Sequence, residues 1–336
     1  MARPSSPSTR PRRAGFLRTL AAGALALVAV AGCGSSEQAS TATPQPGAPA
    51  TAGAAEFPVT LKHQFGETTI PAQPTRVVTV GYNEGDFPLA LGVVPLGERE
   101  FSGGFAWQDR PWAQAAKGGA QPEVVGGDEL QFEKIAALAP DLILGVYSFM
   151  DQATYDTLAK IAPTVGPPGD GTKAATWQEQ TRITGQALGL TAKAEQVVAD
   201  TETKLAQVKA AHPALDGKNL ALDFDVEGVP YRLGTDDLRS QLFAGLGMKV
   251  GDTTETLTAE TLQPLDQQAL IVMGVTQQQL AGNQLFQSLN VVKNGKTLYL
   301  GDYTTSFAGA LGYSSPLSLP YAADLVAPQL QTALAG

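Results

Sequence analysis

Residues 132–146 have the sequence FEKIAALAPDLILGV and contain the two kinds of element from which the fold is built. The first part, 132–138, is rich in helix formers, and Pro140 follows as a stop signal. The second part, 141–146, is an apolar run of the kind found in strands buried inside parallel sheets. A helix followed directly by a buried strand is the repeating unit of an α/β fold.

The same alternation continues on both sides of this stretch. Toward the N-terminus we predict a hairpin around Gly66 (59–63 with 67–71), strands at 76–81 and 92–97, and a helix at 87–91. Toward the C-terminus, 176–212 is the longest helical candidate, with an interruption at 189–191 left open. A second series then has strands at 219–224, 269–273 and 296–300, and helices at 238–246, from 258 and at 285–289.

These elements predict two α/β lobes with mainly parallel sheets, joined by a single long helix, with a ligand cleft between the lobes. The chain has 336 residues, 43% of them hydrophobic, which is enough for about two domains. The expected boundaries are a signal peptide at 1–32, a flexible tether at 33–56, an N-terminal lobe at 57–170, a connecting helix at 171–213 and a C-terminal lobe at 214–336.

The N-terminus has the features of an export signal. An arginine-rich segment ends at Arg18, and the apolar run 20–31 after it is too short to span a bilayer. The next residues, Val-Ala-Gly-Cys33, resemble the lipobox of bacterial lipoproteins, which predicts lipidation of Cys33 and an anchor at the outer face of the cell membrane. Arg12 and Arg13 resemble a twin-arginine signal with one residue too many before Phe16, so the export route stays open.

The charge of the chain argues against a nucleic-acid-binding protein, and its cysteine content argues against a disulfide-stabilised one. Residues 1–32 hold five arginines and no acid, so 18 basic and 32 acidic residues remain from Cys33 onward, a net charge of −14. Nucleic acid is therefore not an expected partner. Cys33 is the only cysteine in the chain, so the exported body has no internal disulfide and depends on its core for stability.

Six stretches, in their order along the chain, carry a resemblance to a known family. They are RVVTVG (76–81), LALGVVPLGE (89–98), FEKIAALAPDLIL (132–144), YDTLAKIAPTV (155–165), LTAETLQPLDQQALIV (257–272) and SPLSLPYA (315–322). Together they resemble the substrate-binding lipoproteins of ABC importers for ferric siderophores and cobalamin, over about 57–330. The resemblance implies two lobes bridged by a rigid helix, a shallow cleft with limited closure, and a permease and ATPase as partners.

The resemblance also assigns a role to two acids. Glu133 and Glu260 fall where the family has one exposed glutamate per lobe that meets arginines of the permease. One carboxylate on each lobe would mainly increase the rate at which the protein encounters the permease and fix its orientation there. Both residues could equally be acids favoured by a helix dipole in a first turn, and the two readings are compatible.

Candidate ligand-binding residues come first from a loop, 101–112, in which four of twelve residues are aromatic. Aromatic rings beside an arginine suit a large, planar, anionic guest, so Phe101, Trp107 and Arg110 are candidates. Alternatively, the loop packs on its own lobe. Because α/β lobes bind ligands at the carboxyl ends of their strands, further candidates are Tyr82, Asn83, Glu84, Asp86, Tyr147, Ser148, Tyr231, Arg232, Asp302, Tyr303 and Phe307. Arg232 could instead pair with an internal carboxylate such as Asp236 or Glu227.

The function expected from these features is capture of an iron(III)–siderophore complex and its delivery to an ABC importer, by a monomer that uses no cofactor and makes no bond. Cobalamin or another metal chelate is the alternative ligand. Few basic residues in the candidate loops count against a tris-catecholate, and only two histidines, His63 and His212, count against haem or a naked transition-metal ion. A hydrolase that uses a carboxylate pair such as Asp223 and Asp225, and an adaptor without a small ligand, are the other classes.

Overall fold

The computed structural model describes residues 57–100, 110–170, 174–226, 228–258, 260–301 and 305–335. Within them lie two five-stranded sheets and one hairpin, accompanied by helices, so the predicted α/β class is confirmed. We call the elements around the first sheet the N-terminal lobe and those around the second the C-terminal lobe. None of the helices described is long and apolar enough to cross a membrane.

The hairpin predicted near the start is present. Strands β1 (Val59–His63) and β2 (Gly66–Ile70) pair antiparallel, with His63 opposite Gly66. Gly66 is therefore the first residue of β2, and its φ of 118° explains why a glycine stands there. Burial alternates along both strands, and buried residues such as Leu61 and Ile70 pack into the core of the N-terminal lobe.

The first sheet is parallel throughout, in the order β5-β4-β3-β6-β7. Its strands are β3 (Val77–Thr79), β4 (Gly97–Glu98), β5 (Glu123–Val124), β6 (Leu142–Leu144) and β7 (Thr164–Val165). The helices of this lobe before the long ones are α1 (Asp86–Ala90), α2 (Gln114–Lys117), α3 (Phe132–Ala137) and α4 (Gln152–Ala159). Of the strand predicted at 92–97, only Gly97 lies in a strand, β4. The start of the predicted range belongs to the end of α1 instead, because the amides of Gly92 and Val93 donate to the carbonyls of Leu89 and Pro88.

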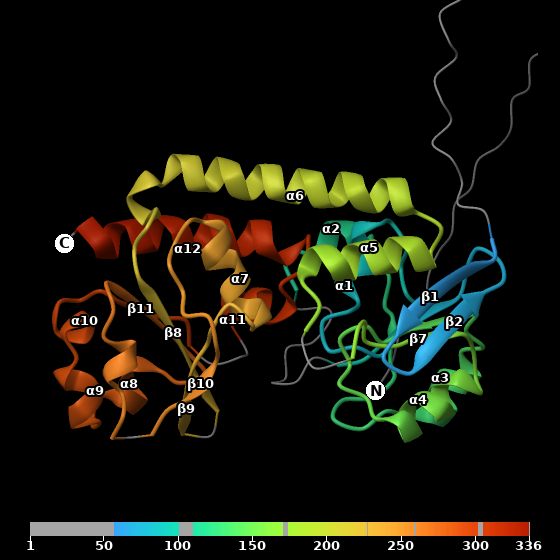
Figure 1. Ribbon diagram of the computed structural model, residues 1–336, viewed down its shortest axis with the longest axis horizontal. Coiled ribbons are helices and arrows are strands. Elements are labelled where there is room, and N and C mark those ends of the chain that lie inside the picture. The colour runs from blue at the N-terminus through green and yellow to red at the C-terminus, as the bar shows by residue number, and fades with distance from the viewer. Residues whose placement is uncertain are drawn as a thin grey trace, which may run out of the picture. The chain divides into compact units, whose positions relative to one another are not determined.

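The long helical candidate 176–212 is two helices, α5 (Trp177–Ala187) and α6 (Thr191–Ala211). A capping box of Thr176 and Glu179 begins α5, and Gly189, with a φ of 70°, lies in the break between the helices. The two helices pack against each other, and a Cβ at Gly185 would collide with Ala194. The single long helix is therefore α6, which also packs on the C-terminal helix α12 (Ser318–Ala335) (Figure 1).

The second sheet has the order β10-β9-β8-β11-β12. Its strands are β8 (Leu220–Val226), β9 (Val229–Arg232), β10 (Glu255–Thr256), β11 (Ala269–Met273) and β12 (Thr297–Tyr299). Strands β8, β11 and β12 are parallel, whereas β9 and β10 add an antiparallel edge. The remaining elements are α7 (Leu238–Gly245), α8 (Gln277–Leu280), α9 (Gln284–Ser288), α10 (Asn290–Lys293), α11 (Ser306–Tyr313) and the short 3-10 turns η2 (Pro213–Leu215) and η3 (Gln263–Leu265).

Successive residues of β8 face two different cores. Leu220 and Leu222 lie in a core that includes residues of α7, α11 and α12, whereas Ala221 lies in a core with Leu262 and Phe286. This alternation follows from the period of two along a strand. It places Asp223 and Phe224, at the carboxyl end of β8, on opposite faces of the sheet.

Candidate functional site

The loop after β6 carries an exposed aromatic ring. Phe149 is 67% exposed and has a φ of 52°, which is a rare and strained conformation for an aromatic residue. Its ring lies 4.8 Å from that of Tyr147 and 6.1 Å from that of Tyr82, centroid to centroid. These three residues, which we call the aromatic cluster, come from the carboxyl ends of the adjacent strands β3 and β6. Two of them, Tyr82 and Tyr147, were predicted from the sequence.

Glu84 holds the two loops of the aromatic cluster together. Its buried carboxylate accepts hydrogen bonds from the amides of Gly81 (2.8 Å) and Val146 (2.7 Å), and the Tyr82 amide donates to the Tyr147 carbonyl (2.9 Å). Burial raises the pKa of Glu84 to about 8, although both amide hydrogen bonds oppose the rise. Gly81 is required here, because a side chain would collide with the Glu84 carboxylate. Glu84 therefore positions the loops and is not itself a ligand contact.

Arg99 lies beside the aromatic cluster, just after β4. Its guanidinium is 3.8 Å from the centroid of the Tyr82 ring, and Nη2 donates to the Tyr82 hydroxyl (2.7 Å) and to the Asp128 carbonyl (2.9 Å). Burial lowers the pKa of Arg99. Arg99, Tyr82 and Phe149 line a pocket of about 450 Å³. The sequence reasoning missed Arg99, although it directly follows a predicted strand, which was the signal used for the other candidates.

A second arginine, Arg239, lies in the first turn of α7 in the C-terminal lobe. Its guanidinium is 3.5 Å from the centroid of the Phe224 ring, and its Nε donates to the Asp237 carboxylate (2.7 Å). Asp237 also caps α7 by accepting the Arg239 amide (2.9 Å). The Arg239 side chain remains 21% exposed. It was missed because the sequence reasoning treated 238–246 only as a helix.

Tyr147 lies near the surroundings of both Arg99 and Arg239, because its ring belongs to the aromatic cluster and its hydroxyl is influenced by the charge of Arg239. The pKa of the Tyr147 hydroxyl is raised to about 12, mainly by burial and next by the Asp237 carboxylate, whereas the Arg239 guanidinium lowers it. The hydroxyl of an N-terminal-lobe residue is thus within electrostatic range of the charged pair that begins α7. We define the candidate site as Tyr82, Arg99, Tyr147, Phe149, Phe224 and Arg239.

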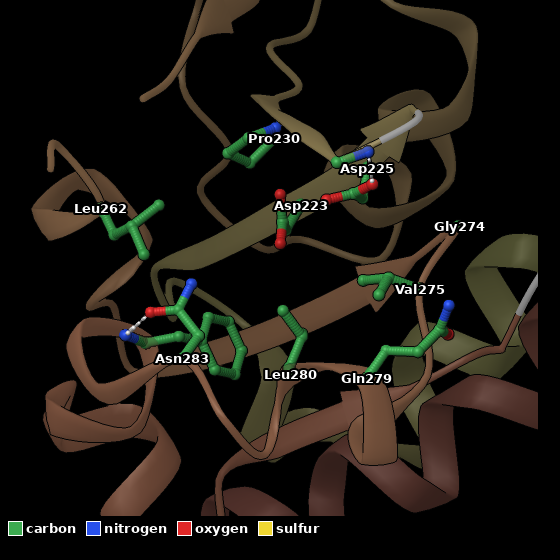
Figure 2. A pocket seen from close by; sticks show the side chains of 11 residues that line it. Asp223, Asp225, Pro230, Leu262, Gly274, Val275, Gln279, Leu280 and Asn283 are labelled. Carbon is green, nitrogen blue, oxygen red and sulfur yellow. Dashed lines mark hydrogen bonds between the residues drawn. The ribbon is translucent and has the colours of Figure 1, made fainter. Parts of the chain in front are cut away.

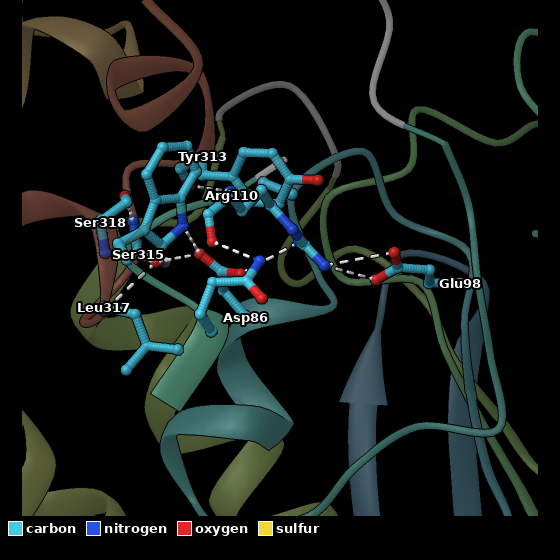
Figure 3. A network of polar contacts seen from close by, with 10 residues as sticks. Asp86, Glu98, Arg110, Tyr313, Ser315, Leu317 and Ser318 are labelled. Carbon is cyan, nitrogen blue, oxygen red and sulfur yellow. Dashed lines mark hydrogen bonds and ion pairs between the residues drawn. The ribbon is translucent and has the colours of Figure 1, made fainter. Parts of the chain in front are cut away.

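Two predicted ligand contacts are buried and are withdrawn. Arg110 is fully buried and donates to Asp86 (3.0 Å) and Glu98 (2.9 Å), as Figure 3 shows. Asn83 is also fully buried, and its Nδ2 donates to the Tyr313 carbonyl (2.9 Å). Neither side chain has surface left for a ligand, because each satisfies groups inside the protein.

The network around Arg110 joins the two lobes. Asp86 accepts hydrogen bonds from Trp112 Nε1 (2.8 Å) and from the Ser315 hydroxyl (2.6 Å), and Ser315 lies between α11 and α12 (Figure 3). The Arg110 guanidinium lies 4.5 Å from the centroid of the Tyr313 ring. This buried network holds the C-terminal helices against the N-terminal lobe.

Arg232, the other predicted arginine, pairs with an internal carboxylate. Its partner is Glu255 on the adjacent strand (3.0 Å), whereas Asp236 accepts from Thr254 instead. The half-buried side chains of Tyr231 and Phe307 pack against the core around α11 and α12. The predicted residues Phe101, Trp107, Tyr303, Asp302, Glu227 and Cys33 lie outside the described residues.

A family of known proteins matches most of this fold. Residues 89–304 match the sequence family described as periplasmic binding protein, which is well over half of the chain. The chain belongs to this family. This periplasmic binding protein is also similar to a periplasmic solute binding protein from Mycobacterium smegmatis, with 33% identity and a TM-score of 0.73 over 82% of this chain and 98% of the other.

Two further relatives have names that state what they bind or transport. The probable siderophore-binding lipoprotein YfiY of Bacillus subtilis is 24% identical over 278 residues, which cover 75% of this chain and 83% of YfiY. The iron uptake ABC transporter substrate-binding protein PiaA of Streptococcus pneumoniae is 25% identical, with a TM-score of 0.70 over 82% of this chain and 99% of PiaA. These relatives are binding proteins, so the hydrolase hypothesis for Asp223 and Asp225 receives no support.

In this periplasmic binding protein the two predicted docking acids are exposed. Glu133 lies in the first turn of α3, as expected. Glu260 does not begin a helix, because Thr258 and Thr261 close a turn through their hydroxyls and the 3-10 turn η3 follows. The dipole explanation therefore applies to Glu133 and not to Glu260.

Proposed function

We propose that this periplasmic binding protein captures an iron(III)–siderophore complex outside the cytoplasm and delivers it to an ABC importer. The names of YfiY and PiaA support both the ligand class and the transport system. In this proposal the protein is a monomer that makes and breaks no bond. It is exported by residues 1–32, anchored through lipidated Cys33 and tethered by 33–56.

One observation carries the ligand assignment. Each lobe presents an arginine stacked on an aromatic ring, Arg99 on Tyr82 and Arg239 on Phe224, and Tyr147 lies within range of the second pair. Ferric siderophores are bulky and often anionic. Stacking rings and guanidinium groups recognise such chelates through contact area and charge-assisted hydrogen bonds. We place the ligand cleft between the lobes at these residues, with the N-terminal lobe at 57–170, the connector at 171–213 and the C-terminal lobe at 214–336.

The ligand class is tested by quenching of tryptophan fluorescence in the protein that begins at Glu56. The titrants are ferric hydroxamate, catecholate, mixed and citrate chelates, their iron-free forms and cobalamin. We expect saturable quenching by one ferric class at submicromolar concentration, which corresponds to more than about 8 kcal/mol of binding free energy. Binding of cobalamin alone would identify the alternative ligand, and no quenching by any titrant would contradict the proposal.

Docking to the permease is proposed to use Glu133 and Glu260. The double variant Glu133→Ala with Glu260→Ala is expected to bind the chelate as the wild type does and to abolish its uptake by cells, since both side chains are exposed and lie outside the candidate site. The measurements are fluorescence titration and uptake of labelled iron. The matched control is Glu67→Ala with Asp200→Ala, which removes two other exposed acids. Normal uptake by the Glu133 and Glu260 variant would refute the docking role.

A further inference from the structure

A separate pocket lies in the C-terminal lobe, on the face of β8 opposite Phe224. Its volume is about 480 Å³, and it is lined by Asp223 and Asp225 on one side and by residues of α8 and α9 on the other (Figure 2). No residue of the candidate site lines it. Its chemistry is therefore not explained by chelate binding.

Asp223 is the unusual group in this pocket. It is only 2% exposed, yet its Oδ1 has no hydrogen-bond partner within the described part of the chain. Burial, and to a lesser extent the neighbouring Asp225 carboxylate, raises the pKa of Asp223 to about 7. Buried polar atoms in native proteins are almost always bonded, so an unbonded oxygen on a carboxylate that lines a cavity indicates a missing donor.

The charged groups on the neighbouring strands do not supply that donor. Arg232 on β9 stands directly opposite Asp223 in the strand register, but its Nη2 pairs with Glu255 on β10, and its buried Nε makes no hydrogen bond to Asp223 or to any other group in the described part of the chain. Asp225 accepts the amide of Gly228 (2.8 Å) and adds negative charge. Helices α8 and α9, which form the other wall, contain no charged residue. The pocket is therefore anionic at Asp223.

The rest of the lining defines what kind of cation would fit. Leu262, Leu280 and Phe286 make part of the wall apolar, which suits a hydrocarbon stem. Asn283 points into the pocket in Figure 2, but its Oδ1 already accepts the Phe286 amide as the cap of α9. Hard metal ions need six or more oxygen ligands, and the described residues contain no group of three His, Cys, Asp or Glu side chains that could hold a metal.

We propose that this pocket binds a primary ammonium group carried on a short apolar stem. The ammonium donates to the Asp223 carboxylate, and the stem lies along Leu262 and Leu280. The site is distinct from the proposed chelate site and goes beyond the proposed transport function.

The test is isothermal titration calorimetry of the protein that begins at Glu56 with pentylammonium, and with pentan-1-ol as a neutral analogue. We expect one pentylammonium per protein at pH 8 and no binding of the alcohol. At pH 6 binding should be about tenfold weaker, because a carboxyl with a pKa of about 7 is roughly 90% ionised at pH 8 and 10% at pH 6. An alkylammonium, with a pKa of about 10, stays charged at both values.

Two variants complete the experiment. Asp223→Asn should reduce pentylammonium affinity at least tenfold and abolish its pH dependence, while Asp324→Asn, which changes an exposed acid on α12, should alter neither. Quenching by the ferric chelate should be unchanged in Asp223→Asn, which also shows that the variant is folded. Equal binding by wild type and Asp223→Asn, equal binding of pentan-1-ol, or loss of chelate binding by a folded Asp223→Asn variant would each overturn the proposal.

Discussion

Arg239→Ala is expected to weaken binding of the ferric chelate by about ten- to 150-fold, which corresponds to the 1.5–3 kcal/mol of a charge-assisted hydrogen bond. The guanidinium is stacked on Phe224, oriented by Asp237 and 21% exposed, so it is positioned in advance at the candidate site. The measurement is the Kd from quenching of tryptophan fluorescence.

The controls for Arg239 separate charge from stacking. Arg239→Lys keeps the charge but loses the planar group, so we expect an intermediate Kd. Arg232→Ala should leave the Kd near that of the wild type, because that guanidinium is bound to Glu255. A Kd that does not change in Arg239→Ala, or that changes more in Arg232→Ala, would place the ligand elsewhere on the protein.

Arg110→Ala is expected to lower the free energy of unfolding by about 3–5 kcal/mol, the cost of breaking a buried ion pair from one side. The substitution leaves the buried carboxylates of Asp86 and Glu98 without their guanidinium partner. Denaturant unfolding measures the loss. As the control, Arg182→Ala removes an exposed ion pair with Glu195 and should change stability little.

The deficit of Arg110→Ala should depend on pH. Burial raises the pKa of Glu98 to about 8 even with Arg110 present, and it also raises the pKa of Asp86. A carboxyl whose pKa is higher in the folded state binds more protons when folded, so its unfavourable effect grows as pH rises and fades as pH falls. The stability difference between variant and wild type should therefore be smaller at pH 5 than at pH 8. A difference that is constant over this range would mean that the carboxylates are not the cause.

Much of the fold could be predicted because its signals are local. The buried strand at 269–273 and the hairpin near Gly66 come from runs and turns that lie close together in the sequence. Helix α12 was missed, although it is long and apolar. The local sequence argues against a helix here because it contains prolines, including Pro328 inside the helix. The helix is nevertheless formed, and it packs on α6 and α11.

The candidate site was harder to predict than the fold, and the arginines show why. Arg110 and Arg232, the two arginines selected from the sequence, bind carboxylates inside the protein, whereas the arginines of the candidate site proposed from the structure are Arg99 and Arg239. The partners of Arg110 are 12 and 24 positions away, and no local pattern reveals that pairing.

The contacts between the N-terminal lobe and the C-terminal helices have a consequence for biosynthesis. The Asp86–Ser315 and Asn83–Tyr313 hydrogen bonds join residues 229 and 230 positions apart, so the partners of this segment are synthesised long after the segment itself. The surroundings of Asp86 and Asn83 can close only after these distant partners have been synthesised. A protein truncated before Tyr313 would lack these partners, although both sheets would be present in its sequence.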